Sequence, residues 1–93
     1  MRITKRGHIL HRMDQLNDLE RRCLQVFVRH IVYGETLISP AALVREAEAA
    51  DRRTGKAAVR YLISAGLIAL DDLGSVELTR EGQKLAYSAE LQT

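Results

Sequence analysis

Apolar residues recur at intervals of three and four between Met13 and Ile31, which is the spacing of one buried face on an amphipathic helix. The members of this face are Leu16, Leu19, Cys23, Val26, Phe27, His30 and Ile31. Asp14 is the candidate N-cap of the helix, and Gly34 is expected to end it in the left-handed conformation. The pattern therefore predicts a first long helix over about 13–33.

A short extended segment and a second helix are predicted next. Residues 36–38 have the composition of a strand, and they are followed by Ser39, which can accept a hydrogen bond from a free amide, and Pro40, which is tolerated at the first helical position. The inner face is expected to hold Leu43, Val44 and Ala47. The outer face is expected to hold Arg45, Glu46 and Glu48.

A third helix is predicted over about 54–65, after a turn at 49–53. Either Asp51 or Thr54 can cap it, and Gly55 near its start would permit close approach of another helix. Its inner face is expected to hold Ala58, Val59, Leu62 and Ile63. Its opposite face holds Arg53, Lys56, Ala57, Arg60, Tyr61 and Ser64. Gly66 ends this helix.

Two short strands and a last helix complete the pattern. Ile68 and Leu70 alternate inward, as do Val76 and Leu78, and Gly74 supplies the positive φ that the turn between them requires. Thr79 is the expected cap of the final helix. The chain is thus predicted to be mainly α with a small β-hairpin (α+β), in the order helix-helix-helix-strand-wing-strand-helix.

Size and composition favour one globular domain. The 93 residues are 46% apolar and 28% charged, which is ordinary for a folded protein of this length. We divide the chain into an arm at 1–12 and a domain at 13–93. A single cysteine cannot form an internal disulfide, and no run of residues suits a signal peptide or a membrane span, so a cytoplasmic location is expected.

The net charge of +2 conceals an uneven distribution. Residues 1–12 hold four bases and no acid, whereas residues 13–93 hold 10 bases and 12 acids. Outside the arm, bases concentrate in Arg52, Arg53, Lys56 and Arg60. Basic regions on a nearly neutral body favour a polyanionic partner.

The segment Val59–Ile68, followed by Val76–Gly82, resembles the winged helix-turn-helix superfamily. The likeness is strongest to small repressors of the multiple-antibiotic-resistance-regulator and phenolic-acid-decarboxylase-regulator kinds. In those families such a segment is recognition helix, strand, wing and a Leu-Thr-x-x-Gly entry to the next helix. The resemblance spans about residues 14–90 and implies a homodimeric transcriptional regulator that binds double-stranded DNA.

The resemblance implies that one set of side chains lies at the DNA. The set is Arg53, Thr54, Lys56, Ala57, Arg60 and Tyr61. The concentration of basic residues adds Arg52, and it adds Arg2, Lys5 and Arg6 as candidate contacts from the arm. Arginine and lysine can hold phosphates, and arginine can bond both acceptors of a guanine edge. For Tyr61 the alternative is a half-buried packing residue.

The turn between the strands departs from the family pattern, because Asp71 and Asp72 stand where such wings carry Arg or Lys. Two carboxylates would be repelled by phosphate. The alternative function is therefore a winged-helix module that binds a protein, through this acidic wing or through the third helix, and does not bind DNA.

Other chemistry is not expected. His8 and His11 lack further ligands for a metal, and no cofactor-binding loop or nucleophile–base motif is present, so the chain is not expected to be an enzyme. Cys23 and His30 are two helical turns apart, about 10.5 Å, which is too far for a hydrogen bond. Cys23 is interpreted as a core residue, with redox sensing as the alternative.

Overall fold

The computed structural model describes residues 16–92, with side chains through residue 87, and that part of the chain forms four helices and a small antiparallel sheet of two strands. The elements are α2 (Asp18–Val32), α3 (Pro40–Glu46), α4 (Arg52–Ser64), β1 (Ile68–Leu70), β2 (Val76–Leu78) and α5 (Arg80–Gln92). The predicted α+β class is confirmed. The arm at 1–12 lies outside the described residues. It includes Arg2, Lys5 and Arg6 and the two histidines His8 and His11.

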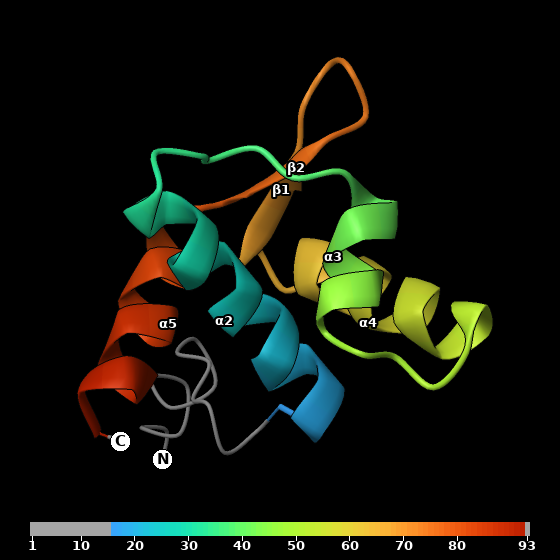
Figure 1. Cartoon of the computed structure of the whole chain (residues 1–93), viewed down its shortest axis with the longest axis horizontal. Coiled ribbons are helices and arrows are strands. Elements are labelled where there is room, and N and C mark those ends of the chain that lie inside the picture. The colour runs from blue at the N-terminus through green and yellow to red at the C-terminus, as the bar shows by residue number, and fades with distance from the viewer. Residues whose placement is uncertain (1–15, 93) are drawn as a thin grey trace, which may run out of the picture.

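Helix α2 is the centre of the fold, with α5 on one side and α3 and α4 on the other (Figure 1). Its buried face carries Cys23, Leu24 and Phe27, each with no exposed surface. The helix begins later than predicted. Its N-cap is Asn17 rather than Asp14, because Asn17 and Glu20 form a reciprocal capping box with each other's amides. Within residues 16–92, no helix has the length and apolar character that a membrane span needs.

Helices α3 and α4 pack closely because a glycine lies between them. A Cβ built on Gly55 would lie 2.9 Å from the Cβ of Val44, so the predicted close approach is confirmed. Of the two candidate caps of α4, the structure selects Asp51, whose Oδ1 accepts from the Thr54 amide at 2.7 Å. Helix α4 therefore begins at Arg52, and Arg52 and Arg53 belong to its first turn rather than to the preceding loop.

The hairpin pairs Ile68 with Leu78 and Leu70 with Val76, and Ile38 bridges Val76 from the other side. The extended segment predicted at 36–38 is thus confirmed at Ile38. Leu70 was expected to face inward, but it is 56% exposed. The reason is its place at the end of β1, where the hairpin projects beyond the helices (Figure 1).

Candidate nucleic-acid interface

Three cationic side chains form one row on the outer side of α4. Arg52, Lys56 and Arg60 are four residues apart, so they lie on the same helical face and extend about 12 Å along the axis. All three are exposed, and no salt bridge to them is formed within the described part of the chain. We call these three residues the cationic row. A face of this kind presents unneutralised positive charge to solvent.

The remaining α4 residues predicted for the interface lie beside the cationic row. Arg53, Thr54, Ala57 and Tyr61 are all exposed, and a shallow depression of about 450 Å³ is lined by Ala57 together with Arg53 and the row. Tyr61 is 39% exposed, as the alternative of a half-buried packing residue expects, and the exposed part of its side chain remains accessible to a ligand. The structure thus brings all seven predicted α4 residues onto one accessible side of one helix.

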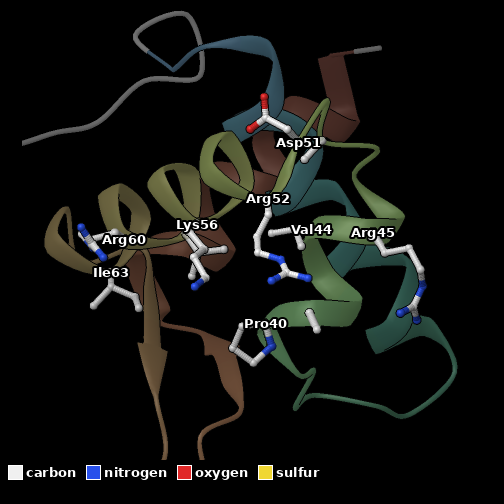
Figure 2. A pocket seen from close by; sticks show the side chains of 11 residues that line it. Pro40, Val44, Arg45, Asp51, Arg52, Lys56, Arg60 and Ile63 are labelled. Atoms are coloured by element: carbon white, nitrogen blue, oxygen red, sulfur yellow. The ribbon is translucent and has the colours of Figure 1, made fainter.

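A groove of about 870 Å³ runs between α3 and α4 alongside the cationic row (Figure 2). Its apolar lining consists of Pro40, Ala41, Val44, Ala49, Val59 and Ile63. Ile63 was predicted to lie in the core, but it is 36% exposed and lines this groove. The inner face of α4 is narrower than predicted, because the core is already filled by Ala58, Val59 and Leu62. The exposure of Ile63 and Ala41 was not predicted.

The two acids of the hairpin have different roles. Asp71 organises the turn: its Oδ1 accepts hydrogen bonds from the amides of Leu73 at 2.9 Å and Ser75 at 2.8 Å. Asp72 is exposed and makes no such contact within the described residues. At the tip, Leu73 is 90% exposed. The turn therefore carries two carboxylates, of which that of Asp71 also holds the backbone of the turn.

His30 links α2 to α3 and to the loop between them. Its Nδ1 lies 2.7 Å from Oε1 of Glu35, and its Nε2 lies 2.8 Å from Oε1 of Glu46. Carboxylates only accept hydrogen bonds, so both ring nitrogens donate when the imidazole is protonated. The two hydrogen bonds raise the pKa of His30, and the bond to Glu46 has the larger effect. The hydrogen bond from His30 lowers the pKa of Glu46. His30 is thus a polar link rather than part of the apolar stripe, and Glu46 is not simply an outward charge.

We expect the His30 link to stabilise the protein most in mildly acidic solution. Because the pKa of His30 is raised in the folded protein, the link stabilises the fold at pH values below the pKa of His in the unfolded chain, about 6.5. This stabilisation is lost as the pH rises through the folded pKa of His30. Because the pKa of Glu46 is lowered in the folded protein, its ionised carboxylate stabilises the fold at pH values above the pKa of Glu in the unfolded chain, about 4.3. This stabilisation is lost as the pH falls through the folded pKa of Glu46. The stability difference between wild type and His30→Ala, measured by urea unfolding, should therefore be greatest near pH 5–6. A difference independent of pH between 5 and 9 would contradict this.

Cys23 is enclosed in the core and has no exposed surface. Burial raises the pKa of its thiol to about 11, so the reactive thiolate is scarce at neutral pH. Both facts support the interpretation of Cys23 as a packing residue and oppose the alternative of redox sensing.

Comparison with known proteins identifies no relative of this chain. No family model matches the sequence, and neither the curated proteins nor the solved structures contain a significant match. The site is therefore interpreted from its own geometry and charge.

Proposed function

We propose that this chain is a DNA-binding protein, a transcriptional regulator of the winged helix-turn-helix type whose α4 enters a major groove. The observation that carries the proposal is the cationic row, which is exposed and forms no salt bridge within the described residues, on the side of α4 that borders the groove with α3. The order of elements, three helices followed by a hairpin and a helix, supports it as well. In the helix-turn-helix arrangement the second of two packed helices, here α4, contacts the bases.

The residue types of α4 suit both parts of DNA recognition. Lys56 would hold a phosphate, and Arg53 or Arg60 would hold a phosphate or bond O6 and N7 of a guanine. Ala57 lies in the depression between these cations and presents a methyl group that can contact a thymine methyl. The partner is accordingly double-stranded DNA.

The regulator is proposed to act as a homodimer. One α4 contacts only a few base pairs, and dimers of such domains combine two half-sites about one helical turn apart. Helix α5 is the proposed contact because it carries Tyr87, which is 38% exposed. The arm at 1–12, which could add to this contact, lies outside the described residues.

Binding to duplex DNA as a function of salt tests this proposal. With four cations on α4 engaged by phosphates, the logarithm of the association constant should fall against the logarithm of salt concentration with a slope of about −3.6 per protomer. Random duplex of about 30 base pairs and fluorescence anisotropy between 50 and 300 mM NaCl would measure it. Absence of binding even at the lowest salt would exclude DNA as the partner.

The alternative, a module that binds protein through an acidic wing, has weaker support. Asp71 holds two amides of its own turn, so of the two carboxylates only that of Asp72 has no structural role within the described residues. Under this alternative the protein would not bind any duplex, at any salt concentration.

A further inference from the structure

The groove between α3 and α4 has an apolar floor that water covers in the free protein. Ile63 is 36% exposed and Ala41 is exposed, and Pro40 and Val44 are half-buried. These side chains come from both helices, so the floor is continuous across the groove (Figure 2). Phosphates gain nothing from contact with an apolar surface, so the phosphate contacts proposed for the cationic row do not explain the floor.

The charges along the groove are strongly unequal. The cationic row lies on the α4 side and Arg45 on the α3 side, against one carboxylate, that of Asp51. Asp51 is held by the Thr54 amide, which lowers the pKa of its carboxyl group and keeps it ionised as the cap of α4. An occupant must therefore be apolar along its centre and negative along its edges. The chain's own segment 1–15 does not fit, since it holds four bases and one acid.

We propose that this groove docks an acidic amphipathic helix of a partner protein. A helix seats its apolar stripe in a groove through positions i, i+3, i+4 and i+7, while acids on either side of the stripe meet the flanking cations. From Arg52 to Ile63 the groove follows α4 for about 16 Å, which is about three turns of a docked helix. Charge complementarity and the apolar floor together select this occupant.

Docking has a consequence for DNA binding, and this consequence rests on the proposed function. The helix and the duplex would use the same cationic row, so each excludes the other. The partner is thus expected to act as an antagonist of DNA binding.

A designed peptide tests the docking directly. The probe is a labelled helix of roughly 16 residues, with leucines on one face and glutamates on both sides of them, and anisotropy measures its binding. The comparison peptide has the same composition in an order that spreads the leucines around the helix. Tighter binding of the first peptide by about tenfold or more is expected from burial of its apolar stripe. Equal binding of the two would mean that only charge attracts them, and would overturn the proposal.

Matched variants locate the contact. Ile63→Gln is expected to weaken binding of the amphipathic peptide about tenfold without changing the charge of the groove. Leu73→Gln, the same change at the hairpin tip where the side chain is 90% exposed, is expected to leave peptide binding unaltered. Circular dichroism verifies that both variants are folded. Equal effects of the two variants would place the peptide elsewhere and overturn the proposal.

The duplex measurement separates this inference from the proposed function. Ile63→Gln should retain the salt-dependent binding of random duplex, because the cationic row is untouched. If wild type binds the peptide but no duplex, the docking site stands and DNA binding fails. If it binds duplex but does not distinguish the two peptides, the docking site fails and DNA binding stands.

Discussion

Replacing Arg52, Lys56 and Arg60 together by alanine is expected to lower the affinity for duplex DNA about a thousandfold at low salt. A hydrogen bond to a charged group contributes about 1.5 kcal/mol or more, so three of them contribute about 4.5 kcal/mol. The slope of the logarithm of the association constant against the logarithm of salt concentration should also become shallower by about 2.7, because three phosphate contacts and their released counterions are lost. Folding should be unaffected, because the three side chains are exposed and alanine favours a helix.

A charge-matched control distinguishes the row from net charge. Arg29, Arg80 and Lys84 are exposed on α2 and α5, and their joint replacement by alanine removes the same three charges from other faces. Because Arg80 and Lys84 share α5 with the proposed dimer contact, the two variants are compared by the salt slope per protomer, most of which this control should preserve. Equal losses in the two triple variants would show that diffuse charge, and not α4, attracts the duplex.

Gly82→Ala is expected to destabilise the fold by more than about 3 kcal/mol, above the usual range for overpacking. A Cβ at this position would lie 1.9 Å from the carbonyl oxygen of Leu67 and 3.0 Å from Cδ2 of Leu78. The carbonyl is backbone and already accepts from the Thr79 amide at 3.1 Å, so it cannot move aside at little cost. The whole first turn of α5 would have to shift away from the junction of α4 and β1.

Gln83→Ala is the control, because Gln83 is the next residue along the same turn and is exposed. Urea unfolding should show little change for Gln83→Ala and a large fall in midpoint for Gly82→Ala. A midpoint for Gly82→Ala within the error of wild type would mean that α5 does not approach Leu67 this closely.

Gly82 also gives a physical reason for the Leu-Thr-x-x-Gly pattern that suggested the family. Leu78 is buried, and Thr79 Oγ1 donates to the Gly66 carbonyl at 2.6 Å and accepts from the Gly82 amide at 3.0 Å. The glycine then permits contact between α5 and the backbone of Leu67. The predicted cap at Thr79 is confirmed, and its bond to Gly66 ties the start of α5 to the end of α4.

The differences between the predictions and the structure share one cause. The spacing of apolar residues along the chain does not show which other segments pack against them. Ile63 and Leu70 have the right spacing for an inner face, yet the neighbouring elements cover them only in part and leave them 36% and 56% exposed. The sequence places His30 on the apolar face of α2. It does not show that Glu35 and Glu46, from two other segments, form hydrogen bonds with the imidazole. Asp14 was chosen as a cap from residue type alone, whereas the capping box at Asn17 needs Glu20 as well.

The sequence by itself determined the order of the elements, the caps at Ser39 and Thr79, the glycine turns and the cationic face of α4, because these depend on residues close together in the chain. Only the tertiary structure decided that Asp71 serves its own turn, that His30 joins α2 to α3, and that an apolar groove lies beside the cationic row. Each of these depends on how the chain folds in space. A local pattern specifies which face of a helix is apolar, but only packing specifies how much of that face is covered.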